Sequence, residues 1–315
     1  MDPQVERLIA MLKAATPADA PKMWQLTVAD ARARSELFFA LFNEGGPAMA
    51  EVRTVAVPGR RGAIRARLYV PHGIATTSPG LLYLHGGGFV ICSPQTHDRL
   101  TRELAEGIGA RVLSLDYALA PEHPYPHGLD DCEDAARWLH REGATLGIDP
   151  GRLMIGGDSA GASLAASVLL RLRDRDRVDA FRVAILLYGR YTFEDTDAIR
   201  AWGDRDFILS RKVMNWFADH YLGDRDRRDA YVAPLAADLR GLPPAVLVAG
   251  TLDPLVDDSR LLADALRRAG VEAELLVYPD GPHAFVQMHV LDMAADAVGK
   301  ICAFARRHVG LDGAA

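Results

Sequence analysis

Residues 157–161 read Gly-Asp-Ser-Ala-Gly, which has the composition of a turn that exposes a reactive serine. They lie between an apolar run at 153–155 and an alanine-rich stretch that predicts a helix. A Gly-x-Ser-x-Gly turn between a strand and a helix pushes its serine outward, because the glycines leave room beside it. The start of the helix then favours negative charge on the serine oxygen. Ser159 is the candidate nucleophile, although Asp158 or Ser159 could instead serve only as a helix N-cap.

A serine nucleophile needs a base and a group that orients the base. His283 lies in a Pro/Gly-rich turn just after a predicted strand that ends at Tyr278, and Asp253 follows the predicted strand before that one. His289 is the competing base, and its alternative interpretation is a histidine on the surface of a helix. The acids that follow Asp253, at 257 and 258, are expected to cap the next helix and charge its first turn.

A glycine-rich loop follows the predicted strand at 81–84. Residues 85–89 read His-Gly-Gly-Gly-Phe. Three adjacent glycines lose much conformational entropy on folding, so a purely structural loop rarely needs them. Such a backbone can approach a substrate closely and donate amide hydrogen bonds to an oxyanion. The loop, serine, aspartate and histidine each follow a predicted strand, and together they favour serine-based acyl transfer over an ordinary helix start.

Strands and helices alternate through most of the chain. Strands are predicted at 52–57, 64–70, 81–84, 111–116, 153–157, 183–187, 245–249 and 275–278, with helices near 98–108, 129–140, 162–173, 257–269 and 289–308. The strands are rich in Val, Ile and Leu and read as buried on both faces. This pattern predicts an α/β fold with a mostly parallel sheet covered by helices.

Two segments fall outside the alternation. Residues 1–50 have apolar residues at helical spacing, and residues 188–243 are aromatic and charged with no convincing strand. Either segment could pack as core, but an insertion over the carboxyl ends of strands is a natural lid. We therefore predict a catalytic domain at 51–315 and a cap whose two parts are 1–50 and 188–243.

Composition excludes several classes of protein. The 315 residues carry a formal net charge of −6, and the arginines alternate with acids rather than forming a basic patch, so a nucleic-acid partner is not expected. Three cysteines without ligand spacing favour free thiols over a disulfide framework or a metal site. No stretch resembles a signal peptide or a membrane span. A cytoplasmic protein without a metal site or membrane partner is expected, and the turn at 157–161 lacks nucleotide-binding spacing.

With these residues the chain resembles the bacterial hormone-sensitive-lipase-like (family IV) esterases of the α/β-hydrolase fold. The resemblance runs from about residue 81 to residue 285 and includes the His-Gly-Gly-Gly loop, the Gly-Asp-Ser-Ala-Gly turn and Asp253-Pro254-Leu255. Residues 116–117 (Asp-Tyr) and 119–124 (Leu-Ala-Pro-Glu-His-Pro) also match. The chain order serine, aspartate, histidine is that of this fold. The resemblance implies an eight-stranded sheet, a helical cap, no cofactor and hydrolysis of short-acyl carboxylic esters.

The resemblance also implies a role for individual residues. Ser159 is the expected nucleophile, His283 the base and Asp253 its partner. The expected oxyanion donors are the amides of Gly87, Gly88 and Ala160, and the expected supporting residues are His85, Gly86, Asp158 and Glu122. Glu122 is expected to be a buried acid behind the glycine loop, with a surface salt bridge as the alternative. The candidate substrate-pocket residues are Phe38, Phe42, Phe89, Tyr188 and Phe285.

Several positions depart from the family pattern. Ala118 stands where an arginine is usual, which puts an ion pair to Glu122 in doubt. Cys92 and Ala284 stand where glycine is common, and Cys92 is either a thiol that affects activity or a buried inert one. Gly189-Arg190-Tyr191 replaces the usual proline after Tyr188, so the acyl or alcohol side of the pocket is expected to be unusual.

The sequence thus predicts a serine carboxylesterase for small esters, with a homodimer as a possible assembly. Two other functions stay open. An amidase or deacetylase for a specific metabolite would use the same residues, and hydrolase folds also serve as ligand-binding modules once the histidine is lost.

Overall fold

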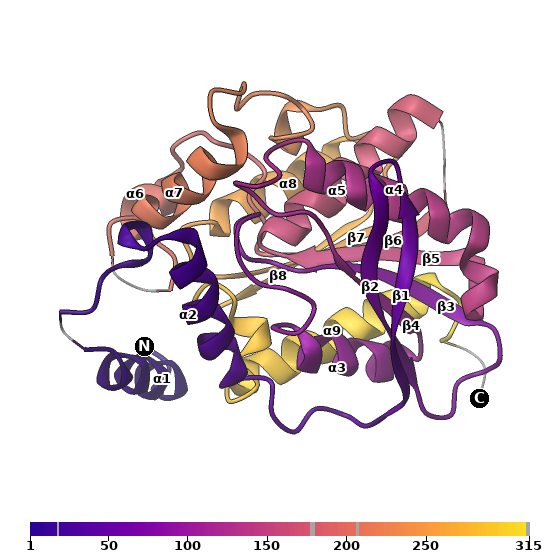
Figure 1. The fold of residues 1–315 in the computed structure, drawn as a ribbon, viewed down its shortest axis with the longest axis horizontal. Coiled ribbons are helices and arrows are strands. Elements are labelled where there is room, and N and C mark those ends of the chain that lie inside the picture. Colours follow the sequence, from indigo (N-terminus) through magenta and orange to yellow (C-terminus); the bar gives the residue numbers. More distant parts are fainter. Residues whose placement is uncertain (18, 177–179, 206–207, 313–315) are drawn as a thin grey trace.

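One eight-stranded sheet forms the centre of the structure, a computed structural model that describes residues 1–17, 19–176, 180–205 and 208–312 (Figure 1). The strands are β1 (Met49–Gly59), β2 (Gly62–Pro71), β3 (Ser78–Leu84), β4 (Arg111–Asp116), β5 (Ile148–Asp158), β6 (Phe181–Leu187), β7 (Ala245–Gly250) and β8 (Ala273–Tyr278). Their order in the sheet is β1-β2-β4-β3-β5-β6-β7-β8. The β1–β2 and β2–β4 pairs are antiparallel and the remaining pairs are parallel.

The central strands are apolar along their whole length because helices cover both faces of the sheet. Every residue of β3 and of β7 is buried. Each predicted strand is present, and the prediction of a mostly parallel, eight-stranded sheet is confirmed. The parallel arrangement brings the carboxyl ends of β3, β5, β6, β7 and β8 to one edge, where the loops predicted to carry chemistry begin.

Helices form a layer on each face of the sheet. The longer helices are α1 (Pro3–Ala15), α2 (Val28–Ala40), α3 (Asp98–Ile108), α4 (His127–Glu142), α5 (Ala160–Asp176), α6 (Asp197–Trp202), α7 (Arg211–Leu222), α8 (Val256–Arg268) and α9 (Asp292–His308), and the 3-10 turns are η1 (Met23–Gln25), η2 (Gly143–Leu146), η3 (Pro234–Ala236) and η4 (Phe285–Gln287). Figure 1 shows α3 and α9 against one face and α4, α5 and α8 against the other. None of the described helices has both the length and the apolar character needed to cross a bilayer.

The last helix begins later than the sequence predicts. It starts at Asp292, so the expected start at His289 is wrong. The chain from Phe285 to Leu291 instead forms a short 3-10 turn and a further turn. It buries Phe285, Val286, Met288 and Leu291 in the core and leaves Val290 exposed. His289 is therefore a loop residue, with Nδ1 3.1 Å from the carbonyl oxygen of Phe42.

Helices of two separate segments lie beyond the sheet. Figure 1 places α2 of the N-terminal segment near α6 and α7 of the segment after β6, η1 packs against α7, and α1 lies farther from α6 and α7. Thr27, Thr196 and Ser210 accept backbone amides at the starts of α2, α6 and α7, which fixes where each begins. The two sequence segments predicted to form a cap thus meet in space, and residues 206 and 207 of the second segment lie outside the described residues.

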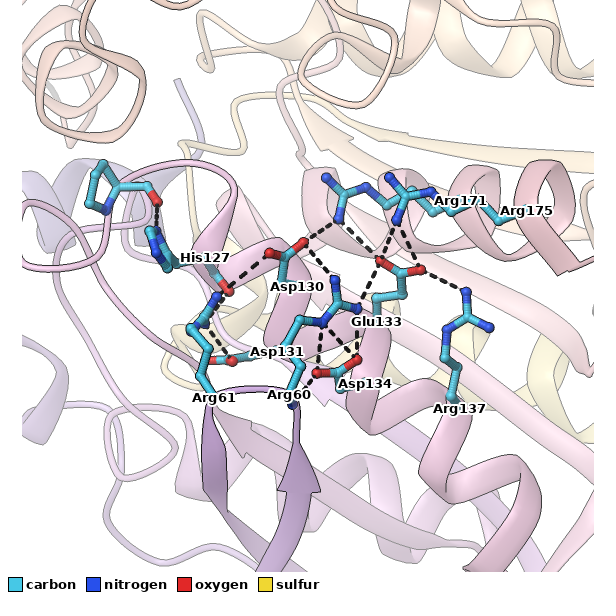
Figure 2. A network of polar contacts seen from close by, with 11 residues as sticks. Arg60, Arg61, His127, Asp130, Asp131, Glu133, Asp134, Arg137, Arg171 and Arg175 are labelled. Atoms are coloured by element: carbon cyan, nitrogen blue, oxygen red, sulfur yellow. Dashed lines mark hydrogen bonds and ion pairs between the residues drawn. The ribbon is translucent and has the colours of Figure 1, made fainter.

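A charged network fastens the β1–β2 hairpin to α4 and α5 (Figure 2). Glu133 is 1% exposed and receives Arg171 Nη1 at 3.1 Å and Arg137 Nη2 at 2.7 Å. Arg60, at the tip of the hairpin, reaches the same carboxylate at 3.3 Å and Asp134 at 2.7 Å. Because Glu133 is buried and each partner is a guanidinium, its charge is compensated only while the hairpin and both helices stay in place.

Glu133→Ala should lower the free energy of unfolding by about 3–5 kcal/mol, since it leaves the nearly buried Arg171 with one carboxylate fewer. Urea unfolding followed by circular dichroism measures this difference. The matched control is Glu142→Ala at the exposed end of the same helix, which should change stability by less than about 0.5 kcal/mol. Equal effects of the two substitutions would contradict the account of the network.

Candidate active site

The turn at 157–161 is a tight corner between β5 and α5. Ser159 has φ 51°, a backbone conformation that residues other than glycine rarely adopt. Gly157 and Gly161 both lie against the carbonyl oxygen of Leu84 at the end of β3, and a Cβ on either would overlap that oxygen. The glycines are therefore required by close packing of the turn on the neighbouring strand, and this packing turns Ser159 out into the cavity described below.

Three side chains from different loops meet in one hydrogen-bonded chain. His283 Nε2 lies 2.9 Å from Ser159 Oγ, and His283 Nδ1 lies 2.7 Å from Asp253 Oδ2. Asp253 is fully buried and its other oxygen accepts the Leu255 amide at 2.8 Å. In the tautomer that satisfies both contacts, Nδ1–H donates to the aspartate and Nε2 accepts the serine hydroxyl. The three residues singled out from the sequence are thus brought together.

His289 takes no part in this arrangement. Its Nδ1 contacts a backbone carbonyl, and it is absent from the described residues that line the cavity. Of the two candidate histidines, only His283 reaches the serine.

The glycine loop presents backbone amides beside the serine. Gly87 and Gly88 have φ 109° and 58°, which glycine adopts without strain. Within the described residues, neither amide donates a hydrogen bond, and both residues line the cavity with Ser159. Ala160 begins α5, so its amide belongs to the unpaired first turn of the helix. The three expected oxyanion donors therefore border the same cavity as the serine oxygen.

Asp158 joins the serine turn to the glycine loop. Its buried carboxylate accepts Tyr83 Oη at 2.8 Å, the Gly86 amide at 2.9 Å and Gln287 Nε2 at 2.8 Å, and His97 Nε2 lies 3.1 Å away. Burial raises the pKa of Asp158, but the charge and hydrogen bonds around it outweigh burial and hold the pKa below its usual range. The supporting role expected of Asp158 and Gly86 therefore has a physical basis.

Sequence reasoning missed His97 and Gln287 in this cluster. His97 directly precedes α3, and Gln287 comes four residues after His283. Neither belongs to a motif, and the contacts that bring them to Asp158 span 61 and 129 residues of the chain. Only the folded chain brings them together.

His85 braces the start of the loop. Its ring stacks on Tyr117 at 4.3 Å and its Nδ1 lies 2.7 Å from the Gly86 carbonyl oxygen. Burial lowers the pKa of His85 to about 3, so the ring is neutral at physiological pH and Nδ1 donates to that oxygen. The residue acts through packing and one hydrogen bond, as expected of a supporting residue.

Glu122 corrects one prediction, because it is not a buried acid behind the glycine loop. Its side chain is 54% exposed and pairs with Arg32 of α2 at 2.7 Å. That contact lowers the pKa of Glu122 to about 2. Arg32 also donates to the carbonyl oxygens of Val90 and Ala120. The arginine expected near residue 118 is thus replaced by one from the N-terminal segment, which ties α2 to the loop.

The two other departures occupy unusual backbone positions. Cys92 and Ala284 have φ 71° and 65°, a region that glycine occupies without cost and that explains why glycine is common there. Cys92 is 6% exposed, and burial raises the pKa of its thiol. Of the two interpretations of Cys92, burial favours the inert thiol.

A cavity of about 410 Å³ lies above the serine. Phe38 and Phe89 line it, as predicted, but the other three candidate pocket residues do not. Phe42 is 2% exposed and packs against Phe38. Tyr188 and Phe285 are fully buried and pack on each other, and Tyr188 also packs against the ring of His283. Helical and strand periodicity identifies apolar residues but does not show whether they face the hydrophobic core or an apolar cavity. These three residues lie in the core.

The sequence-based list also lacked aromatic residues that do line the cavity. They are Trp24, Phe39, Phe193, Phe217 and Tyr221. Phe217 of α7 packs directly over Gly88, where a Cβ would overlap its ring. The cavity wall is therefore built largely by the N-terminal segment and the segment after β6.

Asp257 and Asp258 lie in the first turn of α8, as predicted, but neither caps the helix, whose N-cap is Leu255. Asp258 is fully buried, and its Oδ1 accepts the amides of Tyr191 and Thr192 at 2.7 and 2.9 Å. Asp257 Oδ2 accepts the amide of Ala198 at 2.8 Å. The two acids thus hold the segment that follows β6, which a local capping rule does not capture.

The stability of the protein should depend on pH through Asp258. Burial raises its pKa to about 7, although the two amides partly offset this. The folded state therefore keeps a proton that the unfolded chain releases near pH 4, so this carboxyl lowers stability progressively from about pH 4 to pH 7. Asparagine cannot ionise. The free energy of unfolding of Asp258→Asn, relative to that of the wild type, should therefore rise by about 2 kcal/mol from pH 5 to pH 8.

Urea unfolding at the two pH values measures this change. Asp264→Asn, at an exposed acid on the same helix, is the control and should show no such shift. A wild-type to Asp258→Asn difference that is equal at pH 5 and pH 8 would contradict the assignment.

Comparison with known proteins agrees with the geometry. The sheet order, the serine turn between β5 and α5 and the loops at the strand ends define an α/β hydrolase. The family profile described as the alpha/beta hydrolase fold matches residues 81–287, and the chain belongs to this family.

Two of the three proteins compared here are named as an ester hydrolase or an esterase, and the third as an α/β hydrolase. The carboxylic ester hydrolase LipN of Mycobacterium tuberculosis is 37% identical over 249 residues, which are 76% of this chain and 66% of LipN. A hyperthermophilic esterase from the archaeon Pyrobaculum calidifontis is 33% identical, with a TM-score of 0.91 over 98% of both chains. An α/β-hydrolase enzyme from the metagenome of Lake Arreo, Spain, is 34% identical, with a TM-score of 0.93 over 98% of both chains.

Proposed function

We propose that the chain is a serine carboxylesterase that hydrolyses short-acyl carboxylic esters. The observation that carries the proposal is the chain of contacts from Ser159 Oγ through His283 to Asp253, at 2.9 and 2.7 Å. Membership of the α/β-hydrolase family and the ester-hydrolase names of the relatives support it. Ser159 is the proposed nucleophile, His283 the general base and Asp253 the residue that orients the base.

The geometry suits a two-step reaction. His283 Nε2 takes the hydroxyl proton as Ser159 Oγ attacks the ester carbonyl, and the amides of Gly87, Gly88 and Ala160 bind the resulting oxyanion. His283 then gives the proton to the leaving alcohol. Water repeats the sequence on the acyl-enzyme, with His283 again as base, and releases the acid. Asp253 keeps Nδ1 protonated throughout, so that Nε2 is free to accept a proton.

The cavity supports a preference for small substrates. Its volume of about 410 Å³ lies within the range of about 300–1,000 Å³ that is usual for small-molecule sites. Residues 1–50 and 188–243 are the proposed cap, because α1, α2 and α7 contribute to the lining. Substrates with long acyl chains should fit less well than short ones.

Hydrolysis of p-nitrophenyl esters from acetyl to palmitoyl tests the proposal. We expect kcat/KM to be highest for short acyl chains and to fall by at least tenfold at palmitoyl. Comparable values for butyryl and palmitoyl esters would contradict the size preference. Activity on anilides but on no ester would favour the amidase alternative, and no covalent turnover of any acyl compound would favour a ligand-binding module.

The compartment and the assembly stay predictions. Cys92, Cys132 and Cys302 are free and buried, which supports a reducing compartment such as the cytoplasm. A homodimer is a candidate assembly, and size-exclusion chromatography with light scattering would test it.

A further inference from the structure

Arg190 is a cation in the wall of the cavity, next to the helix that carries the serine. It follows β6 in the run Gly189-Arg190-Tyr191, which replaces the proline that the family usually has after Tyr188. Its backbone amide donates to Ser163 Oγ at 3.1 Å, and its carbonyl oxygen accepts that hydroxyl at 2.7 Å. Ser163 lies one helical turn after Ser159 on α5, and both serines line the cavity with Arg190. The backbone of Arg190 is thus hydrogen-bonded to a residue that lies one helical turn from the proposed nucleophile.

The side chain of Arg190 has few partners for its charge. Its Nε donates to the Thr192 carbonyl oxygen at 3.1 Å, and its guanidinium lies 4.0 Å from the centre of the Phe193 ring. Burial lowers its pKa to about 10, so it stays charged at neutral pH. Among the ion pairs of the described ranges, none includes Arg190. A largely buried cation without a carboxylate is costly, which leaves it suited to an anion from outside the chain.

The acid whose charge acts most strongly on Arg190 is Asp258, whose Oδ1 is already hydrogen-bonded and whose buried Oδ2 has no hydrogen-bond partner among the described residues. Asp258 Oδ1 binds the amides of Tyr191 and Thr192, so the carboxylate positions the segment that carries Arg190 without forming an ion pair with it. Because burial disfavours ionisation of Asp258, it offsets the arginine charge only in part. This leaves the guanidinium available on the cavity side.

Most charged side chains around the cavity are cations. Lys13, Lys22 and Arg34 line it together with Arg190, although the whole chain has a net charge of −6. Among its described lining residues the one acid is Asp158, whose carboxylate is buried under its own donors. Cations around an apolar cleft raise the local concentration of anions and speed their entry.

We infer that the preferred substrates are esters that carry a carboxylate, which pairs with the guanidinium of Arg190 while the apolar body of the ester lies against the aromatic wall. This inference rests on the proposed esterase function and specifies its substrate class. The Lys and Arg side chains at the mouth attract the anion, and Arg190 binds it inside. A carboxylate presents two acceptor oxygens to the two amino groups of a guanidinium, which is the geometry that arginine binds best.

Matched ester pairs test the inference. Mono-p-nitrophenyl adipate and p-nitrophenyl hexanoate differ by a carboxylate on the acyl side, and 4-acetoxybenzoate and 4-methylphenyl acetate differ by one on the alcohol side. For each pair, the measured quantity is the kcat/KM of the charged ester divided by that of the neutral ester. In Arg190→Gln this ratio should fall at least about tenfold for one pair, chiefly through KM, whereas Arg190→Lys should keep most of it.

The outcomes separate the two proposals. An unchanged ratio in Arg190→Gln for both pairs would overturn the inference, as would an equal loss with Arg190→Lys, which would make the residue structural. Wild-type protein that cleaves none of the four esters would instead overturn the esterase function. If Arg190→Gln does not fold, the wild type decides: raising NaCl from 0.05 to 0.5 M should lower the charged-to-neutral ratio, and a constant ratio would overturn the inference.

Discussion

Ser159→Ala should lower kcat for p-nitrophenyl butyrate by on the order of a millionfold, the loss found when the nucleophile of a serine protease is removed. The substitution deletes the oxygen that lies 2.9 Å from His283 Nε2 and leaves no other described hydroxyl in contact with that nitrogen. Alanine also fits the turn, because the constraints there come from Gly157 and Gly161. Steady-state kinetics with the same active-protein concentration measures the loss.

Ser167→Ala is the matched control for this substitution. Ser167 lies two turns further along α5, donates to the Ser163 carbonyl oxygen at 2.9 Å and is absent from the described lining of the cavity. It should keep kcat within about threefold of the wild type. Residual activity of Ser159→Ala near the wild-type value, in protein free of contaminating esterase, would show that the serine is not the nucleophile.

Asp253→Asn should lower kcat by about 10,000-fold, the size of the effect that the corresponding change has in a serine protease. An asparagine keeps the shape of the side chain, but its amide nitrogen can face His283 Nδ1 in place of a carboxylate oxygen. The imidazole would then carry its proton on Nε2 and could not accept the serine proton. Single-turnover kinetics with p-nitrophenyl acetate separates this loss from a change in substrate binding.

The control for Asp253→Asn is Asp264→Asn, at an exposed acid of α8 that pairs with Arg267 at 3.1 Å. It should leave kcat unchanged within twofold. A loss of kcat in Asp253→Asn of less than about tenfold would contradict the assigned role, because the aspartate would then not determine which nitrogen of His283 carries the proton.

The chemistry of the site was predictable because it depends on local sequence. Ser159, Asp253 and His283 each follow a strand that can be recognised in the sequence as an apolar run. Parallel strands bring their carboxyl ends to one edge of the sheet. The glycines of the loop and the turn are equally informative about the local backbone, because only glycine tolerates these backbone angles or the close contact with Leu84. Spacing and residue type thus sufficed to predict the sheet and the contacts among Ser159, His283 and Asp253.

The rest depends on contacts between distant segments. The sequence predicts a buried acid at Glu122, but the side chain is exposed and pairs with Arg32, which lies 90 residues earlier in the chain. The sequence positions of Tyr188 and Phe285 predict pocket residues, yet both side chains are fully buried in the core. The aromatic wall arises where the N-terminal segment meets α7 of the segment after β6, and no periodicity within either segment reveals that meeting. Predicting such features requires knowledge of how the segments pack.

The central claim is that an acyl group is transferred to Ser159, and covalent labelling tests it most directly. A p-nitrophenyl phosphonate ester mimics the tetrahedral intermediate and remains on the serine that attacks it. The account predicts release of one equivalent of p-nitrophenolate per protein, with the label located by tandem mass spectrometry on Ser159. It predicts no label in Ser159→Ala. Labelling of Ser163 or of any other residue in the wild type, or equal labelling of Ser159→Ala, would contradict the account.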